Sequence, residues 1–429
     1  MKLELSKVYI QRFTFAENTS LVHGHLRLNN TDLQQFIHSL HPMITEIETV
    51  IVRPGEEVRI LPVKDVIEPR TKLSNGYCFP GFKPGEEGMV GEGSTLALKG
   101  IAVVTTGKVV GFQEGIIDMC GPGAAYTPYS SLHNLVLRIE VDAKCNQYQH
   151  EEILRMVGLM TARWIAEQVK ETSIDETVHY ETLPLYEQKA QYPDLPAVGY
   201  VYMLQSQGLL HDTWFYGVDV KKMVPTLMCP TEVMDGAVVS GNCVSACDKN
   251  TTWSHQNNPV IESLYRRHGR DLNFIGVILT NENVTLIDKV RSSNMVARLA
   301  EQLSLDGVII TEEGFGNPDA DLMMNCQKLE AKGIKTVLLT DEYAGREGES
   351  QSLADAHPAA DAVVSVGNAN QLISLPPMKR VIGHPIYANT IAGGFDGSLH
   401  DDGSMTVELQ AITGSTSELG IHTLTAHSG

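Results

Sequence analysis

A cysteine near the middle of the chain stands where its thiol could attack the peptide bond that precedes it. Cys243 follows Asn242, and Gly241 precedes both. Glycine lets the backbone bend and approach closely, as an intramolecular N-to-S acyl shift requires. The thiolate would attack the Asn242 carbonyl, and the thioester would make the Cys243 α-proton easier to remove. β-Elimination would then leave a dehydroalanine, which hydrolyses to a pyruvoyl group.

Such a cleavage would divide the chain into residues 1–242 and residues 243–429, the second beginning with an electrophilic carbonyl. No side chain supplies a ketone, so a protein that needs one must make it from its own backbone. An ordinary turn that holds a buried thiol explains the same residue types. The residue types alone therefore leave both interpretations open.

Carboxylates recur where strands of the second half are expected to end. Three short β-branched runs are each followed directly by acidic residues: Thr280-Asn281-Glu282, Thr311-Glu312-Glu313 and Thr340-Asp341-Glu342. The carboxyl ends of parallel strands meet at one edge, where open α/β folds bind ligands, so these acids should gather there. They could hold a cation, stabilise a protonated imine or serve a partner subunit, and helix capping explains each of them singly. No glycine-rich dinucleotide fingerprint precedes them, which disfavours a nucleotide cofactor.

A glycine-rich loop in the first half is a second candidate for a ligand site. A strand pair is expected from Leu96 to Val110, and the stretch Gly111 to Gly123 follows it with Gln113, Glu114 and Asp118 set among glycines. Loops between strands commonly carry binding residues. Ordinary turns with solvated acids account for the same pattern, so both interpretations are kept.

The periodicity predicts a β-rich first part and an α/β second part. Strand-like alternation dominates residues 1–148, a helix is expected from Gln149 to Lys170 within residues 149–242, and strands alternate with helices through residues 243–429. Strands separated by helices imply right-handed crossovers and a mostly parallel sheet. We predict an α/β protein with a β-rich N-terminal portion, an α/β segment ending at the cleavage site, and a C-terminal Rossmann-like domain.

The composition limits the cellular compartment and the classes of binding partner that we expect. The 52 acidic residues against 33 basic ones give a net charge of -19, which argues against nucleic acid and anionic membranes as partners. The start of the chain has no apolar export segment, and no run of apolar residues is long enough to span a bilayer. The odd count of seven cysteines is typical of reduced thiols. We expect a cytoplasmic protein.

Long stretches of the chain resemble one known family. The processing region, from Pro230 to Ala237 and from Ser240 to Asn250, is similar to that of the component B precursors of the glycine, sarcosine and betaine reductase family, with D-proline reductase as a more distant relative. The resemblance extends to Leu61–Arg70, Gly111–Asp118 and Thr311–Asn317, and so covers nearly the whole chain. It implies that Cys243 becomes a pyruvoyl group after cleavage at Asn242.

The resemblance also implies an activity, reductive deamination of glycine, which leads to acetyl phosphate. An amine is a poor leaving group, but condensation of the glycine nitrogen with the ketone gives an imine that draws electrons from the carbon-nitrogen bond. A soft nucleophile can then attack the α-carbon. In the family this nucleophile is a selenolate on a separate selenocysteine-containing component B subunit, and component A, a small selenoprotein, receives the carboxymethyl group.

Imine formation needs a general acid to expel hydroxide, with a pKa near the working pH. The candidates are Asp118, His211, Glu312 and Glu313, and the sequence does not rank them.

Three alternatives stay open. The substrate could be sarcosine, whose secondary amine can condense with a ketone, or betaine, whose quaternary nitrogen cannot. The chain could be an uncleaved scaffold that binds partners. A metal site made of Cys243, Cys247 and His255 is disfavoured, because Cys-x3-Cys with one such histidine is not a standard zinc spacing; no metal is expected.

Overall fold

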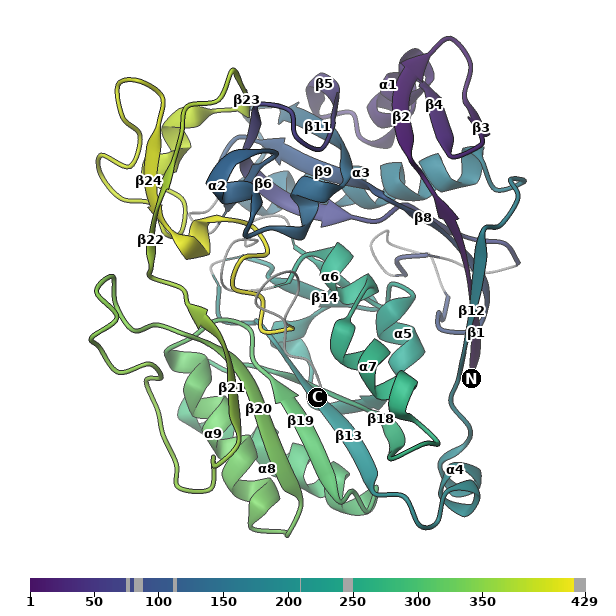
Figure 1. Cartoon of the computed structure of the whole chain (residues 1–429), viewed down its shortest axis with the longest axis vertical. Coiled ribbons are helices and arrows are strands. Elements are labelled where there is room, and N and C mark those ends of the chain that lie inside the picture. Colours follow the sequence, from purple (N-terminus) through teal and green to yellow (C-terminus); the bar gives the residue numbers. More distant parts are fainter. Residues whose placement is uncertain (75–77, 81–87, 111–113, 209, 242–249, 420–429) are drawn as a thin grey trace.

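The computed structural model describes residues 1–74, 78–80, 88–110, 114–208, 210–241 and 250–419. The chain forms a β-rich part and an α/β part (Figure 1). The predicted class is confirmed, because the N-terminal elements are mainly strands and the C-terminal sheet is mostly parallel.

The α/β part is built on a sheet with the order β16-β18-β13-β19-β20-β21. β16 runs antiparallel to β18, and the other neighbours are parallel. Leaving out β16, the order along the chain is 2-1-3-4-5, a doubly wound sheet whose switch point lies between its first and third strands, here β13 and β19. The strands are β13 (Ala197–Leu204), β16 (Thr226–Met228), β18 (Asn273–Asn281), β19 (Gly307–Thr311), β20 (Lys335–Glu342) and β21 (Val363–Asn368).

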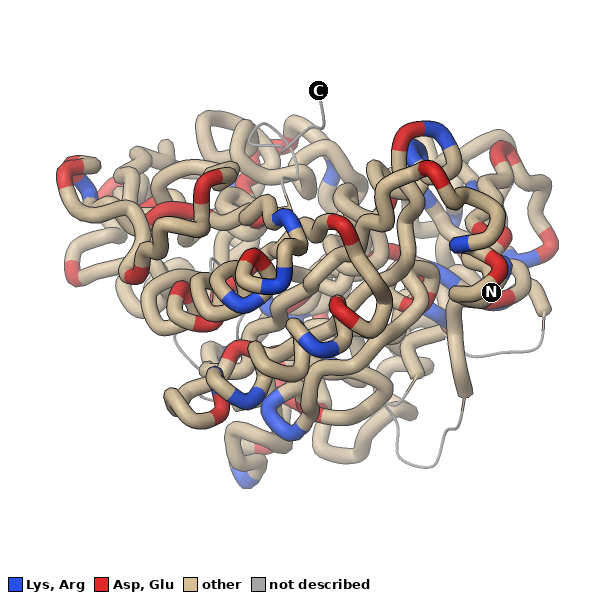
Figure 2. Tube along the Cα trace, turned by 90° about the horizontal axis from the view of Figure 1, so that it is seen from below, with Lys and Arg blue, Asp and Glu red and all other residues tan. Residues whose placement is uncertain are grey.

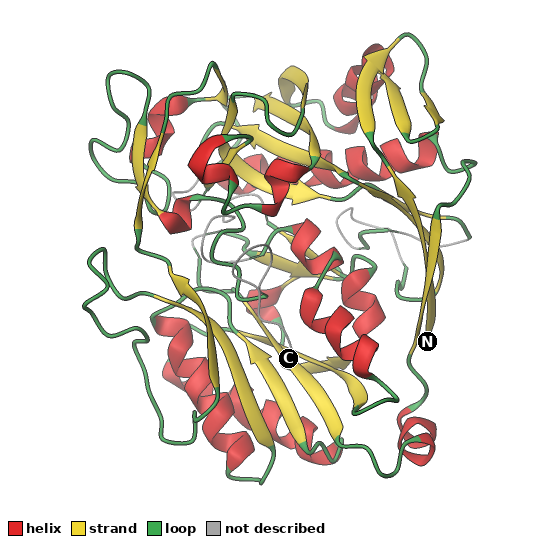
Figure 3. Cartoon of the chain, in the orientation of Figure 1, coloured by secondary structure: helices red, strands yellow, loops and turns green. Residues whose placement is uncertain are grey.

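Helices cover both faces of this sheet (Figure 3). Alternate residues of β13 face opposite sides, as strand geometry requires: Val201 and Met203 pack with α8 (Leu286–Gln302) and α9 (Asn317–Glu330), whereas Tyr200 and Tyr202 pack with α5 (Pro230–Met234) and α7 (Pro259–Arg267). β13 is therefore buried on both faces.

The β-rich part is organised around β6 (Val58–Ile67), every residue of which is buried. Its sheet has the order β10-β6-β9-β11-β5, and β23 also pairs with β6. Helix α3 (Gln147–Gln168), predicted from Gln149 to Lys170, packs against this sheet. A second sheet has the order β12-β1-β8-β7. These strands are β1 (Lys2–Tyr9), β5 (Ile44–Val52), β7 (Arg70–Lys72), β8 (Gly93–Lys99), β9 (Ile101–Gly107), β10 (Gly115–Asp118), β11 (His133–Val141), β12 (Glu176–Glu181) and β23 (Arg380–Gly383).

Smaller elements complete the chain. A small sheet joins β2 (Arg12–Ala16), β3 (Ser20–Val22) and β4 (His25–Asn29), and another joins β14 (Thr213–Phe215), β15 (Val218–Asp219) and β17 (Val238–Ser240). β22 (Leu372–Leu375) pairs with β24 (Met405–Glu408). The remaining helices are α1 (Asn30–Leu40), α2 (Gly121–Ala124), α4 (Leu185–Gln191), α6 (Thr252–Gln256) and the 3-10 turns η1 (Pro128–Ser131), η2 (Val220–Lys222), η3 (Pro385–Asn389) and η4 (Leu409–Ala411).

Acidic and basic residues are interspersed along the trace (Figure 2), and several meet as buried pairs. Three of these pairs are fully or almost fully buried: Arg59 with Asp118, Lys64 with Glu114, and Arg70 with Glu68. Buried charges are tolerated when they are paired and hydrogen-bonded. Among the described residues, no helix is long and apolar enough to cross a bilayer.

Strands from both sides of the expected cleavage site are interleaved. β13, which precedes the site, lies between β18 and β19, which follow it. Conversely, β23 from the end of the chain pairs with β6. The division into residues 1–148, 149–242 and 243–429 stays a prediction.

The two fragments should therefore remain associated after cleavage at Asn242. We expect the 1–242 fragment to retain the 243–429 fragment during affinity purification and gel filtration, because separation would break backbone hydrogen-bond ladders in both sheets and expose the buried strand β13. A denaturing gel of the single gel-filtration peak should show two bands, and uncut Cys243→Ala protein should elute at the same volume. Elution of the 243–429 fragment in a peak of its own would contradict the interleaved fold.

Candidate functional site

Asn242 and Cys243 lie outside the described residues, but the chain is described up to Gly241 and again from Asn250. Ser240 N donates a hydrogen bond to Thr252 Oγ1 at 3.0 Å. Residues 240 and 252 are therefore neighbours, and the chain enters and leaves residues 242–249 at one place. The functional site is built from the residues that fix these two flanks.

The backbone of Gly241 runs directly beside that of His211 and Asp212. Gly241 N donates to Asp212 O at 2.8 Å, and a Cβ at position 241 would overlap the carbonyl oxygen of His211. Asp212 is itself fully buried and pairs with Lys221 at 3.3 Å. Glycine is thus required at position 241, because any side chain would push the residue before Asn242 out of place.

Asp65 in β6 holds the other side of the same flank. Its Oδ1 accepts from Thr252 N at 2.9 Å, and its Oδ2 accepts from Thr252 Oγ1 at 2.6 Å. Since Thr252 Oγ1 also accepts from Ser240 N, one buried threonine hydroxyl joins Asp65 to β17, the strand that leads into residues 242–249. The β-rich part thereby positions the flank.

Strand β7 and the turn before it make further hydrogen bonds to the segments that precede and follow residues 242–249. Gln256 Oε1 accepts from Glu68 N at 2.9 Å, and its side-chain amide returns a bond to Glu68 O at 3.1 Å. Arg70 donates to Met234 O at 2.5 Å and to Gln256 O at 3.2 Å. Burial alone would raise the pKa of Glu68, but Lys99 and Arg70 outweigh it and hold that pKa below its usual value. These charged groups tie together the segments on both sides of residues 242–249.

His211 also forms a histidine-aspartate pair. Its Nδ1 lies 2.9 Å from Asp219 Oδ2. Burial would raise the pKa of Asp219, but hydrogen bonds from His211 and the Lys221 amide outweigh it and hold the pKa low. An ionised Asp219 can only accept, so Nδ1 donates and Nε2 is the nitrogen that can take up a proton. The ring also contacts Trp214, with centroids 4.8 Å apart.

Buried ion pairs flank the glycine-rich loop of the first half. Lys64 Nζ lies 2.5 Å from Glu114 Oε1. Val110, before the loop, packs on Leu210, which precedes His211. Asp118 lies further along β10 and pairs with Arg59 at 2.6 and 2.8 Å. Burial raises the pKa of Asp118 although Arg59 acts in the opposite direction.

Glu313 fixes the downstream flank. Its Oε1 accepts from Asn250 N at 2.9 Å and from Asn250 Nδ2 at 3.0 Å, and its Oε2 accepts from Gln205 N at 2.6 Å. Glu418, near the end of the described chain, accepts from Asn250 Nδ2 at 2.6 Å. Glu313 therefore connects residue 250 to the carboxyl end of β13.

The acidic residues at the strand ends gather as expected from the sequence. Glu282 Oε1 accepts from Glu313 N at 2.8 Å, and Glu312 Oε2 accepts from Thr340 Oγ1 at 3.0 Å. Burial raises the pKa of Glu282 well above its usual value, and Glu312 and Glu313 add to this effect. Burial likewise raises the pKa of Glu312, with Asp319 adding to it. Glu282 and Glu312 therefore favour the neutral acid form, which can donate a proton.

Helix capping does not account for these acids. The N-cap of α8 is Thr285, whose side chain accepts from Asp288 N, and the N-cap of α9 is Gly316. Capping by Glu282 or Glu312 is therefore wrong.

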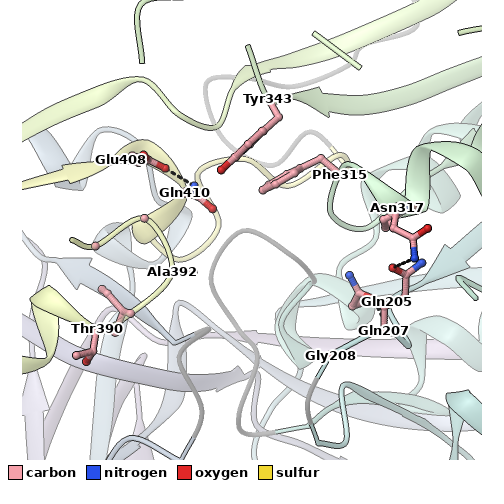
Figure 4. Close-up of a pocket in the computed structure, with 14 residues that line it drawn as sticks. Gln205, Gln207, Gly208, Phe315, Asn317, Tyr343, Thr390, Ala392, Glu408 and Gln410 are labelled. Atoms are coloured by element: carbon pink, nitrogen blue, oxygen red, sulfur yellow. Dashed lines mark hydrogen bonds between the residues drawn. The ribbon is translucent and has the colours of Figure 1, made fainter. Parts of the chain in front are cut away.

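A pocket of about 590 Å³ opens at the switch point between β13 and β19. Figure 4 shows Gln207 and Asn317 on one side, Phe315 beside Tyr343, and Glu408 with Gln410 opposite. Asn317 Nδ2 donates to Gln207 Oε1 at 3.0 Å, and the rings of Phe315 and Tyr343 stack with centroids 4.0 Å apart. Gln205 lines the pocket and also bonds Glu313, so the pocket adjoins the Asn250 flank. This is where doubly wound sheets bind ligands.

The four acid-base candidates thus lie in different surroundings. His211 adjoins Gly241, Glu312 and Glu313 lie together at the sheet edge, and Asp118 lies in the other sheet. His255, considered as a metal ligand, bonds Tyr202 OH through Nδ1 at 2.7 Å, and Cys243 and Cys247 are outside the described residues. The sequence patterns did not indicate Asp65, Thr252 or Glu418 as residues of this site. Asp65 lies within the stretch Leu61–Arg70, whose resemblance to the family could have indicated it. No sequence pattern near the end of the chain indicated Glu418.

The chain is similar to known proteins over its whole length. Residues 1–427 match the family of glycine/sarcosine/betaine reductase component B subunits. The glycine reductase complex component B subunits alpha and beta of Acetoanaerobium sticklandii are 59% identical over 429 residues, and those of Peptoclostridium acidaminophilum are 57% identical over 427 residues. The sarcosine reductase complex component B subunit alpha of Peptoclostridium acidaminophilum is 52% identical over 427 residues. Each comparison covers 99% of both chains. No solved structure matches the chain.

Gly241→Ala should impair cleavage between residues 242 and 243. The added methyl group overlaps the His211 carbonyl oxygen and displaces the residue that precedes Asn242. We expect cleavage at least about tenfold slower, since small misplacements of reacting groups cost about that much or more, measured by mass spectrometry of samples taken over time. Gly307→Ala is the control, because its Cβ would meet its nearest atom at 3.4 Å. Wild-type cleavage in Gly241→Ala would contradict the steric argument.

Thr252→Ala should destabilise the protein by about 1–3 kcal/mol, because it leaves the buried Ser240 N and an Asp65 oxygen without this partner. Thr252→Ser keeps the hydroxyl and should recover most of the stability and the cleavage rate. Chemical unfolding measures the first effect and mass spectrometry the second. If the alanine and serine variants behave alike, the hydroxyl does not link the two strands.

Glu312→Gln should flatten the pH dependence of stability. The pKa of Glu312 is raised in the folded state, so the folded protein binds this proton more tightly than the unfolded chain does. The resulting contribution to the free energy of unfolding is complete below the pKa of the unfolded chain, about 4.3. It is lost as the pH rises through the pKa of the folded state. Glutamine mimics the neutral acid and does not ionise. The melting temperature of the variant should fall less than that of wild type between about pH 5 and pH 9. Glu301→Gln, on the surface of α8, should keep the wild-type slope; an equal or steeper fall in Glu312→Gln would refute this assignment.

Proposed function

The chain belongs to the glycine/sarcosine/betaine reductase component B subunits and so to an oxidoreductase complex, and from this premise we propose that it is the self-cleaving precursor that binds glycine for reductive deamination. The two relatives named for glycine are more similar to it than the relative named for sarcosine. The products proposed are fragments 1–242 and 243–429, with a pyruvoyl group derived from Cys243.

The observation that carries this proposal is the fit of Gly241 against the backbone of His211 and Asp212. An ordinary surface turn does not need such a close approach or two buried anchors. Here Thr252 and Asp65 fix one flank of residues 242–249, and Glu313 fixes Asn250 at the other. A pyruvoyl group supplies a ketone that condenses with an amine and weakens its carbon-nitrogen bond.

Among the proposed acid-base residues, contacts favour His211. Its main chain adjoins Gly241, and Asp219 orients its ring so that Nε2 can accept and return a proton. Glu312 is a second source of protons because its neutral form is favoured. Glu313 is engaged by three N–H donors, and Asp118 by Arg59, so both are better suited to holding structure.

The nucleophile that attacks the α-carbon is proposed to come from a separate selenocysteine-containing component B subunit, with the component A selenoprotein receiving the product group on the way to acetyl phosphate. In every cysteine within the described part of the chain, burial raises the pKa of the thiol, to about 12 at Cys78. Thiols of this kind are poor nucleophiles near neutral pH. This supports a nucleophile delivered by a partner.

Borohydride trapping tests the substrate. Purified protein incubated with radiolabelled glycine and borohydride should retain the label on the 243–429 fragment, because reduction makes the amine linkage permanent. Cys243→Ala protein should retain none. Stronger labelling by sarcosine would indicate a sarcosine reductase subunit, and equal labelling of wild type and Cys243→Ala would refute the pyruvoyl assignment.

A further inference from the structure

A segment near the end of the described chain holds the residue at which that chain resumes after residues 242–249. Residues 412–419, which we call the closing segment, reach the buried side chain of Asn250. Asn250 Nδ2 donates to Glu418 Oε1 at 2.6 Å, and Asn250 Oδ1 accepts from Ser417 Oγ at 2.7 Å. The closing segment therefore supplies a partner for each of the two polar atoms of this side chain.

The closing segment reaches Asn250 by way of the β-rich part (Figure 1). Thr413 N donates to Ile116 O at 2.9 Å, and Thr413 O accepts from Thr127 Oγ1 at 2.7 Å. At the other end of the segment, Leu419 is fully buried in a core cluster that includes residues of β13. The segment can therefore take up this position only when both parts of the molecule are folded.

Glu418 shares its hydrogen-bond donor with a second buried carboxyl group. Glu313 Oε1 also accepts from Asn250 Nδ2, at 3.0 Å. Two buried carboxylates in this position repel each other if both are ionised. Burial raises the pKa of Glu418 well above its usual value, and Glu313 adds to this effect. Glu418 therefore favours the neutral acid, whose carbonyl oxygen accepts from Asn250 without adding a second buried charge.

The closing segment is synthesised after every residue that it contacts here. Before it docks, Asn250 has Glu313 as a partner but lacks both hydrogen bonds to the closing segment. A buried amide group that lacks hydrogen-bond partners is costly, so the native position of Asn250 is favoured only once the segment is in place. The downstream flank of residues 242–249 is therefore fixed only when the chain is folded as far as Leu419.

We propose that docking of the closing segment permits the cut, with Ser417 and Glu418 as positioning residues that act through Asn250 on the bond before Cys243. Cleavage then follows the pairing of strands from both sides of residues 242–249, so the two fragments are already held together when they form. This inference rests on the proposed function, which requires the cut.

The test follows cleavage of the full chain during cell-free synthesis. Pulse-labelled chains are sampled over time and separated on denaturing gels, which resolve the uncut chain from the 1–242 fragment. Glu418→Ala removes the acceptor for Asn250 Nδ2 and should be cut at least about tenfold more slowly than wild type, the scale expected for misplaced reacting groups. Glu418→Gln keeps an acceptor oxygen and imitates the neutral acid, so it should be cut at the wild-type rate.

Two further variants keep the result decisive. Ser417→Ala removes one hydrogen bond and should slow the cut less than Glu418→Ala does. It replaces Glu418→Ala if thermal melting shows that the latter does not fold. Glu330→Ala is the matched control, because Glu330 Oε1 likewise accepts from an N–H group, that of Thr336, at 2.7 Å. Glu330 is the last residue of α9 and bonds the start of β20, so this variant should be cut at the wild-type rate.

The same gels show the order of events. The 1–242 fragment should appear only after full-length chains, and its appearance before them would overturn the proposal. Wild-type cleavage in folded Glu418→Ala, or in Ser417→Ala where it is the replacement, would overturn it as well. So would equal slowing in Glu418→Ala and Glu418→Gln, or in Glu418→Ala and Glu330→Ala. Absence of cleavage in wild type would refute the proposed function instead.

Discussion

The structure depends on a set of buried hydrogen bonds between β6–β7 and the segments around residue 241. Asp65 reaches Ser240 through the Thr252 hydroxyl, and Arg70 binds the carbonyl groups of Met234 and Gln256. A buried carboxylate or guanidinium is costly unless its partners are present, so these residues define each other's positions. The β-rich part therefore works as the support on which the flanks of residues 242–249 are fixed.

The topology brings the remaining groups to the same place. β13 ends at the switch point of a doubly wound sheet, and the residues after it reach Glu313, the pocket and Gly241 in turn. The last described segment returns to this edge, where Glu418 meets Asn250. Strands from before and after residues 242–249 alternate in the sheet, so a cut within these residues would leave the paired strands in place.

Much of this could be predicted from the sequence, for identifiable reasons. β-Branched runs located β18, β19 and β20, and the position of Glu282, Glu312 and Glu313 directly after strands predicted an acidic edge. The anchors could not be found in this way. Asp65 is 187 residues from Thr252, and Glu418 is 168 residues from Asn250, so no local spacing reveals either contact. In the sequence, Asp65 and Glu418 cannot be told from ordinary surface acids, because only the folded structure buries them.

We propose that the bond before Cys243 is cut and that the new terminus carries a carbonyl group. Intact-protein mass spectrometry of catalytically active protein under denaturing conditions tests it most directly. Two masses are expected, one for residues 1–242 and one for residues 243–429 with a pyruvoyl group in place of Cys243. A single uncut mass in active protein would contradict it.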